Sequence, residues 1–143
     1  MTEVAFHFNA PDKVGYACRL LRKAHAQGAR LLVFAEEGDL AALDNALWTL
    51  VVGGFLPHAK AGDPPHVWAR SPIQLTGRMT VDSTASVLVN LQQDVPDGFD
   101  RFARVIEVVT GADDDRRWAR ERWKFYKSNG IEPLRHDLQA ARA

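Results

Sequence analysis

The sequence of 143 residues lacks the features that mark secreted, membrane-bound or disulfide-stabilised proteins. Cys18 is the only cysteine, which excludes an intramolecular disulfide and a cysteine-based zinc site. No apolar run reaches the roughly 18 residues that a membrane span requires. Residues 1–9 have neither a basic start nor a long apolar stretch, so we expect no signal peptide, no membrane partner and a cytoplasmic location.

An excess of charge of either sign is also absent. The chain has 18 Lys and Arg residues against 18 Asp and Glu residues, a formal net charge of zero. A protein that binds nucleic acid through its overall charge is normally basic, so any electrostatic function here must be local. The apolar fraction of 46% and the charged fraction of 25% are ordinary for a globular protein. At this length we expect one domain over residues 1–143.

Phosphate-binding loops are missing as well. The predicted first strand-to-helix turn, residues 8–12, contains no glycine, whereas GxGxxG needs glycine for close approach of a dinucleotide. GxxxxGK[ST] occurs nowhere in the chain. Glu36 and Glu37 follow a predicted buried strand, where an enzyme of this fold class would hold its active site. No partner group for them is identifiable, so we interpret them as a solvated loop and predict no catalytic residue.

Residues with metal-binding or nucleophilic chemistry do not form a recognisable set. The five histidines lack HExxH and HxH spacing. His58 and His66 flank one loop and could approach each other, but they do not make a metal site by themselves. Cys18 falls on the apolar stripe of a predicted helix, which favours a buried structural thiol over a nucleophile. We therefore expect neither a metal nor a cofactor.

Hydrophobic periodicity predicts alternating strands and helices. The predicted strands are residues 4–8, 30–35, 66–70, 72–76, 86–90 and 104–109, with a short extended piece at 55–58. The predicted helices are residues 13–27, 40–50 and 113–129. Pro72 should keep its strand at an edge of the sheet, because proline cannot donate a ladder hydrogen bond. The order predicts an α/β fold: a single-domain, Rossmann-like three-layer sandwich with a mostly parallel sheet and no phosphate-binding loop.

The predicted last helix carries the most informative pattern in the chain. Helical spacing of about 100° per residue gathers one basic face that contains a single aromatic residue. That face consists of Arg116, Arg120, Trp123, Lys124 and Lys127. The opposite side should pack on a core through Trp118, Ala119, Phe125 and Tyr126, with Arg122 among them. An exposed tryptophan ringed by cations suits an acidic peptide, a terminal carboxylate beside an apolar side chain, or nucleic acid. A solvated basic face is the alternative.

Six segments, in this order, resemble a known family, the chi subunit of bacterial DNA polymerase III. They are residues 4–8, 44–48, 55–58, 86–90, 104–109 and 119–126. Each motif is weak alone, but the ordered set covers nearly the whole chain. It ends in the helix ARERWKFY, with Gly130 behind it.

This resemblance implies a non-enzymatic adaptor with a Rossmann-like fold. One surface would bind the acidic C-terminal tail of single-stranded-DNA-binding protein (SSB), which ends in an apolar residue and a free carboxylate. By position, that site would use Arg120, Trp123 and Lys124, with Arg116 at a further basic position. The family often has Tyr where this chain has Trp123. A second surface would bind the small psi subunit, which connects chi to the clamp loader of the polymerase III holoenzyme, so that contact with DNA is indirect.

The psi surface would use Trp48 and Phe55. Trp48 ends an apolar helix and Phe55 follows a Gly-Gly break, so core packing is the alternative for both residues. Two other functions also remain open. Direct single-strand nucleic-acid binding would stack a base on Trp123 and place arginines on phosphates. An enzyme or nucleotide binder on the sheet would need a phosphate loop or a catalytic constellation, and the sequence offers neither.

Overall fold

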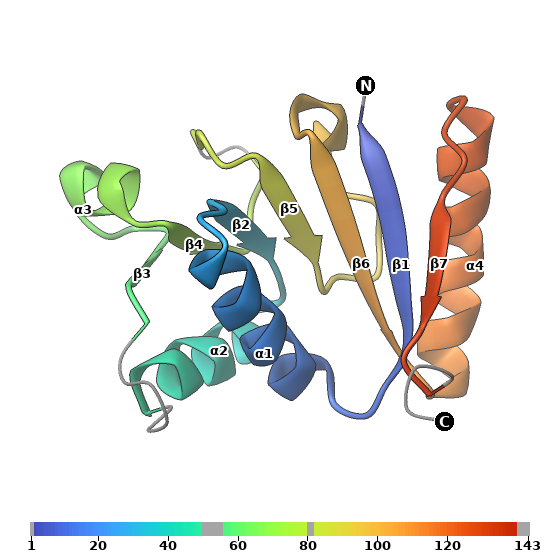
Figure 1. Ribbon diagram of the computed structural model, residues 1–143, viewed down its shortest axis with the longest axis horizontal. Coiled ribbons are helices and arrows are strands. Elements are labelled where there is room, and N and C mark those ends of the chain that lie inside the picture. Colours follow the sequence, from blue (N-terminus) through green and yellow to red (C-terminus); the bar gives the residue numbers. More distant parts are fainter. Residues whose placement is uncertain (1, 50–55, 80–81, 140–143) are drawn as a thin grey trace.

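The computed structural model describes residues 2–49, 56–79 and 82–139 of the chain. In this part of the chain seven strands form one sheet in the order β3-β4-β2-β5-β6-β1-β7, and every neighbouring pair is parallel (Figure 1). The strands are β1 (Glu3–Ala10), β2 (Leu31–Phe34), β3 (His58–Lys60), β4 (Ile73–Thr76), β5 (Val87–Asn90), β6 (Arg104–Thr110) and β7 (Leu134–Asp137). The helices are α1 (Lys13–Ala26), α2 (Glu37–Thr49), α3 (Pro65–Arg70) and α4 (Asp113–Ser128), with a 3-10 turn η1 (Phe99–Arg101).

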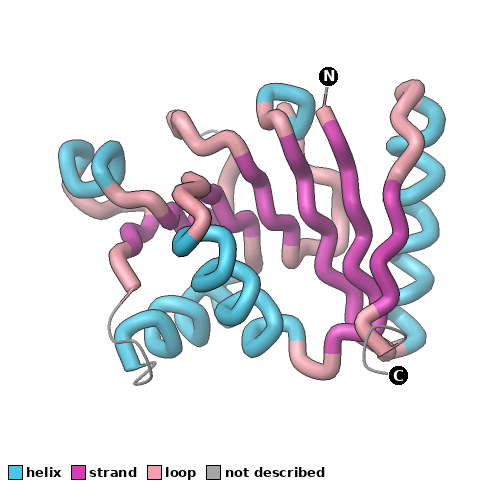
Figure 2. Tube along the Cα trace, viewed as in Figure 1, coloured by secondary structure: helices cyan, strands magenta, loops and turns pink. Residues whose placement is uncertain are grey.

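Helices cover both faces of the sheet, and each face buries its own apolar core. Figure 2 shows α1 and α2 in front of the strands and α4 on the other side. In β2, Leu31 and Val33 join the first core while Leu32 joins the second, which explains why this strand is a continuous apolar run. Cys18 lies in the first core, as predicted. The predicted Rossmann-like three-layer α/β sandwich is confirmed.

The prediction of a strand at residues 66–70 is wrong, because this segment is the helix α3. The β-forming residues Val67 and Trp68 suggested a strand, but Pro65 occupies the first turn, where its fixed φ favours a helix. The Trp68 side chain packs against the second core and donates a hydrogen bond from Nε1 to the carbonyl of Asp82, 2.6 Å away. Tertiary packing therefore overrides the local strand preference.

The predicted edge position of residues 72–76 is also wrong. The strand β4 lies inside the sheet, between β3 and β2. Pro72 precedes the first strand residue, and its carbonyl accepts a 2.8 Å hydrogen bond from the amide of Leu31. Proline is tolerated at the start of a strand, and the N–H that Pro72 lacks therefore removes no hydrogen bond from the sheet.

The edge strand β7 was not predicted. Its residues have the burial pattern of an exposed segment, and Leu134 is its only aliphatic side chain. The strand is identified instead by its pairing with β1, in which Phe6 stands opposite Arg135.

The second helix also begins earlier than predicted, at Glu37. None of the helices in the described part of the chain combines the length and the apolar character that a membrane-spanning segment needs.

Candidate functional site

The helix α4 is fixed to the sheet by four buried side chains on one face. They recur at helical spacing and are Asp115, Ala119, Arg122 and Tyr126. Ala119 lets the helix approach β6 closely, and Tyr126 is wholly buried in the second core. The charged residues of α4 lie mainly on the opposite, exposed face. The sequence prediction of two faces is confirmed for Ala119, Arg122 and Tyr126.

A buried polar network locks this helix in register with β5 and β6. Glu107 of β6 is fully buried; its Oε1 accepts from Arg122 Nε at 2.9 Å and its Oε2 from Tyr126 Oη at 2.7 Å. The Asn90 amide donates to both carboxylate oxygens, at 2.9 and 3.0 Å. Burial, reinforced by the carboxylate of Glu107, raises the pKa of Tyr126. A buried carboxylate is tolerated here because an arginine and two further donors surround it.

The first turn of α4 is held by Asp115, which joins three elements. Its Oδ2 accepts from the backbone N–H of Thr110 at 2.7 Å, and its Oδ1 lies 3.1 Å from Lys13 Nζ of α1. Burial alone would raise the pKa of Asp115, but the Thr110 N–H and the Lys13 ammonium outweigh burial and lower it. The carboxylate therefore stays ionised and ties α4 to the carboxyl end of β6 and to α1.

Trp123 differs from the exposed aromatic that the sequence predicted. Its ring is half-buried, with its centroid 5.1 Å from that of Phe6 and 6.3 Å from that of Phe8. These contacts hold one part of the indole against β1 and leave the rest at the surface. Trp123 is half-buried because helical spacing places it at the border between the buried and the charged face of α4. The Trp123 ring is therefore held in a fixed position rather than freely exposed on both faces.

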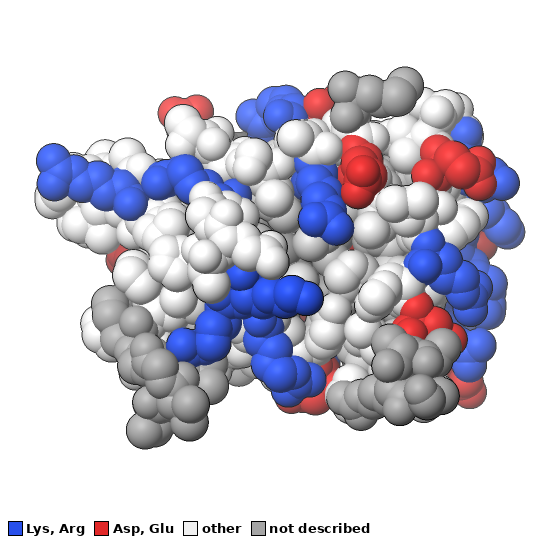
Figure 3. Space-filling model, viewed as in Figure 1, with Lys and Arg blue, Asp and Glu red and all other residues white. Residues whose placement is uncertain are grey.

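A cavity of about 350 Å³ lies between α4, β1 and β7, and we call it the basic pocket. Its apolar surface comes from Phe8, Ala119 and Trp123. Its cations are Arg116, Arg120 and Lys124 of α4 and Arg135 of β7, and Asn9 completes the lining. Figure 3 shows Lys and Arg side chains along the right-hand edge, where Figure 1 places α4. Among the residues that the structure describes, no acidic side chain lines this pocket, so it favours a small anionic group attached to an apolar one.

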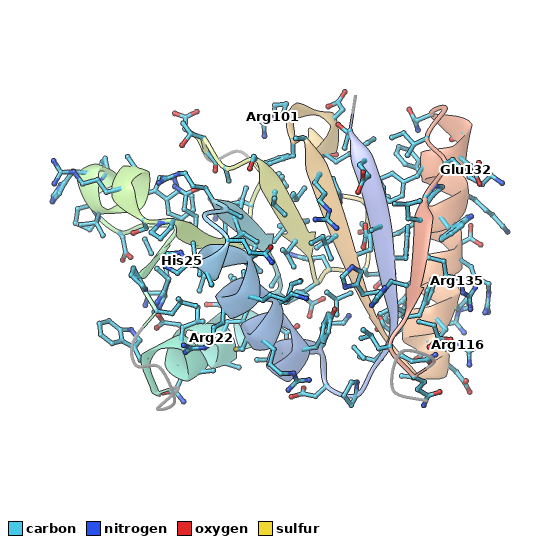
Figure 4. All side chains as sticks on the ribbon, viewed as in Figure 1. Arg22, His25, Arg101, Arg116, Glu132 and Arg135 are labelled. Carbon is cyan, nitrogen blue, oxygen red and sulfur yellow. The ribbon has the colours of Figure 1, made fainter. Side chains whose placement is uncertain are left out.

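Three of the lining residues were missed by the sequence reasoning: Phe8, Asn9 and Arg135. Phe8 and Asn9 lie where β1 changes register against β6, and Asn9 has a positive φ of 63°, a conformation that asparagine tolerates. The Asn9 amide donates to Asp137 Oδ1 of β7 at 2.9 Å. Arg135 comes from the unpredicted strand, on the same edge of the molecule as Arg116 (Figure 4). Only the Asn9-Ala10-Pro11-Asp12 turn gave a signal, and it indicated a turn rather than a pocket.

Two residues of α4 lie elsewhere than expected. Lys127, predicted on the basic face, is exposed but does not line the basic pocket; its Nζ lies 3.9 Å from Glu132 Oε1. Phe125, predicted to pack on the core, is 46% exposed, so that prediction is wrong. Trp118 is only half-buried. The buried stripe is therefore narrower than the predicted one and leaves two aromatic residues at its margin.

The second predicted surface is described only in part. Trp48, in the last turn of α2, is 61% exposed, so the alternative that it is a core residue is wrong. Its ring stands edge-on to His58, with centroids 5.7 Å apart. The His58 ring is itself fixed by Asp44 Oδ1 and by the Leu56 carbonyl, both at 2.7 Å. Phe55 lies outside the described residues. The helices α2 and α4 lie toward opposite ends of the sheet (Figure 1).

The sequence matches a known protein family over most of its length. The sequence model of one protein family, described as "DNA polymerase III chi subunit, HolC", matches residues 1–133. The chain belongs to the chi subunit family of DNA polymerase III. Membership of this family confirms the resemblance inferred from the six ordered segments. It also places the chain among the accessory subunits of DNA replication.

Curated members of the chi family are similar along most of their length. The DNA polymerase III subunit chi of Pseudomonas aeruginosa is 29% identical over 143 residues, which covers 96% of this chain and 98% of that protein. The subunit chi of Escherichia coli is 30% identical over 116 residues, covering 80% of this chain and 78% of its own length. The subunit chi of Haemophilus influenzae is 29% identical over 115 residues, covering 80% and 79%.

Proposed function

We propose that this chi-family protein is a non-catalytic replication adaptor that binds the acidic C-terminal tail of SSB in the basic pocket. The observation that carries the proposal is the pocket itself, in which four cations surround an apolar surface of Phe8, Ala119 and Trp123. A tail that ends in an apolar residue with a free carboxylate presents the complementary chemistry. The terminal side chain would lie against Trp123 while its carboxylate pairs with Arg120 and Lys124.

The geometry supports this ligand over a single-stranded nucleic acid. Trp123 already packs on Phe6 and Phe8, so its ring is not free on both sides as a stacking platform would be. The volume of the basic pocket, about 350 Å³, lies at the lower end of the range for small-ligand sites, which is about 300–1,000 Å³. A pocket of this size suits one side chain with its carboxylate. A nucleic acid would instead require a longer cationic track to follow its phosphates.

The proposal includes a second partner at the opposite end of the sheet. Trp48 offers an exposed aromatic side chain that a psi-like subunit would cover, and Phe55 would contribute to the same surface. Because α2 and α4 lie far apart on the sheet, both partners could bind at once (Figure 1). The chain, acting as one domain over residues 1–143 in the cytoplasm, would then link SSB to the clamp loader of the polymerase III holoenzyme.

The experiment that tests this function compares two forms of SSB. The full-length protein and a form without its acidic C-terminal tail are each titrated against the chi-family protein. We expect binding of the full-length form and none of the shortened one. Equal binding of both forms would exclude the tail as the ligand. Binding of oligonucleotide in the absence of SSB, lost in Arg120→Ala, would favour the nucleic-acid alternative.

A further inference from the structure

A second cavity lies on the other side of α4, facing away from the basic pocket. It has a volume of about 660 Å³ and runs between α4 and residues 93–100, which follow β5 and include the start of η1. We call it the acidic groove. The main-chain carbonyl of Gln93 accepts a 2.7 Å hydrogen bond from Arg122 Nη1, which places this connection on the α4 side of the sheet. The groove and the basic pocket have no lining residue in common in the described part of the chain.

Aromatic side chains make the apolar part of the acidic groove. Phe125 is 46% exposed and Trp118 is half-buried. Phe99 lies on the opposite wall, with its ring centroid 6.3 Å from that of Phe125 and 5.1 Å from that of Tyr126. These edge-on contacts fix the rings of Phe99 and Phe125 in place before any partner binds. Preorganised, partly exposed aromatics are the side chains that dominate protein interfaces.

The lining of the acidic groove includes the buried side chain of Arg122. Arg122 is only 3% exposed, and it directs Nε to Glu107 and Nη1 to Gln93. Its Nη2 is buried and has no hydrogen-bond partner among the described residues. The two bonded nitrogens hold the guanidinium in place beneath the aromatic side chains of the groove.

The rim of the acidic groove determines the charge of its ligand. Four carboxylates line it: Asp94, Asp97, Asp100 and Glu121. Within the described part of the lining, Arg122 is the only Lys or Arg, and Glu107 neutralises it. Like-charge juxtaposition would repel an acidic segment such as the SSB tail, whereas Lys and Arg side chains would find partners around the apolar centre. The charge pattern is the reverse of that of the basic pocket.

We propose that the acidic groove binds an extended segment of a partner protein in which an apolar or aromatic anchor is flanked by Lys and Arg. The anchor lies between Trp118 and Phe125, and the basic side chains pair with the rim carboxylates. Because the groove and the basic pocket use different sides of α4, one helix holds two partners of opposite charge. This assignment does not depend on what occupies the basic pocket.

The test begins with selection of random short peptides displayed on phage against the immobilised full-length protein. Selected peptides are synthesised and titrated by calorimetry. We expect them to share an apolar residue flanked by Lys or Arg, and to bind Phe125→Ala and Asp97→Lys about tenfold or more weakly than the wild type. Arg120→Ala, in the basic pocket, and Glu132→Lys, a charge reversal outside the groove, should leave the affinity unchanged.

Several results would overturn the assignment. The selection could yield no peptide whose binding depends on the groove, or only neutral or acidic peptides. Wild-type affinity for Asp97→Lys would contradict it as well. Asp97 is exposed, so this variant remains informative even if the melting temperature shows that Phe125→Ala is poorly folded.

Discussion

The guanidinium of Arg135 lies over the ring of Phe8, with Cζ 4.7 Å from the ring centroid. The two residues come from opposite ends of the chain and meet because β7 pairs with β1. Arg135 stands opposite Phe6 in the ladder, so its side chain shares the face of Phe6 and Phe8. The contact brings a fourth cation to the basic pocket and fixes its orientation by stacking.

The first prediction concerns this arginine. Arg135→Ala should weaken binding of an SSB-tail peptide by about fivefold to tenfold, because a charge-assisted contact is worth roughly 1.5 kcal/mol or more. Arg135→Lys should recover only part of the affinity, since an ammonium cannot stack on Phe8 as a planar guanidinium does. Calorimetry measures both. Arg70→Ala, a basic residue of α3 far from the pocket, is the control and should bind normally.

The second prediction ranks the cations of α4. Arg120→Ala and Lys124→Ala should each weaken tail binding by about tenfold, whereas Lys127→Ala should have a smaller effect because Lys127 lies outside the pocket lining. All three residues are exposed, so the melting temperatures should stay close to that of the wild type. An Arg120→Ala protein with unchanged affinity would remove the basic pocket from the tail site.

The third prediction concerns salt. Exposed ion pairs are screened over about 8–10 Å at physiological ionic strength, so tail binding should weaken as salt is added. It should not vanish, since burial of the terminal apolar residue against Trp123 does not depend on charge. A titration series in increasing sodium chloride tests both statements. An affinity that is flat across the series would show that the cations do not carry the binding.

The fourth prediction concerns Asp115 and pH. The lowered pKa of Asp115 means that its ionised form stabilises the folded state at neutral pH, and that this contribution is lost as pH falls through the folded-state value. Asp115→Asn should therefore cost about 1–3 kcal/mol of unfolding free energy at pH 7. The difference from the wild type should shrink below about pH 4, where the unfolded carboxyl is protonated.

Urea unfolding at both pH values measures this difference. The matched control is Asp114→Asn, because Asp114 is exposed and pairs with Arg117 only on the helix surface, at 3.1 Å. Such pairs contribute about 0–1 kcal/mol. Equal effects of the two substitutions at pH 7 would show that the contacts of Asp115 with Thr110 and Lys13 do not fix α4.

The fifth prediction concerns the psi surface. Trp48 is exposed, so Trp48→Ala should leave the melting temperature nearly unchanged while weakening binding to a psi-like partner strongly. For Phe55 the same substitution distinguishes two roles. A surface residue would show the Trp48 pattern, whereas a core residue would lose about 3–5 kcal/mol of stability. A melting temperature many degrees below wild type would exclude Phe55 from the partner surface.

The fold was largely predictable because buried parallel strands and amphipathic helices leave strong periodic patterns. The runs that became β2, β5 and β6 were recognised for this reason, and so was α4. The strand β7 was not, because an exposed edge strand carries no hydrophobic pattern. For the same reason the sequence could indicate Arg116, Arg120, Trp123 and Lys124 on one helix but not Arg135, which reaches the basic pocket only through strand pairing.

Local sequence preferences gave wrong predictions at positions where tertiary contacts determine the secondary structure or the burial. Val67 and Trp68 favour a strand, yet Pro65 and the second core make them helical. Helical spacing separated the faces of α4 correctly but could not set the width of the buried face. Its margins, occupied by Trp123 on one side and Phe125 on the other, depend on how closely β1 and residues 93–100 approach the helix.

The most direct test of the central claim is a calorimetric titration with two acidic peptides that differ only at their C-terminus. Both end in an apolar residue, one with a free carboxylate and the other with an amide. The basic pocket predicts that the free carboxylate form binds about tenfold or more tightly, and that Arg120→Ala removes most of that preference. Equal affinity of the two peptides for the wild-type protein would contradict the assignment of the basic pocket to the SSB tail.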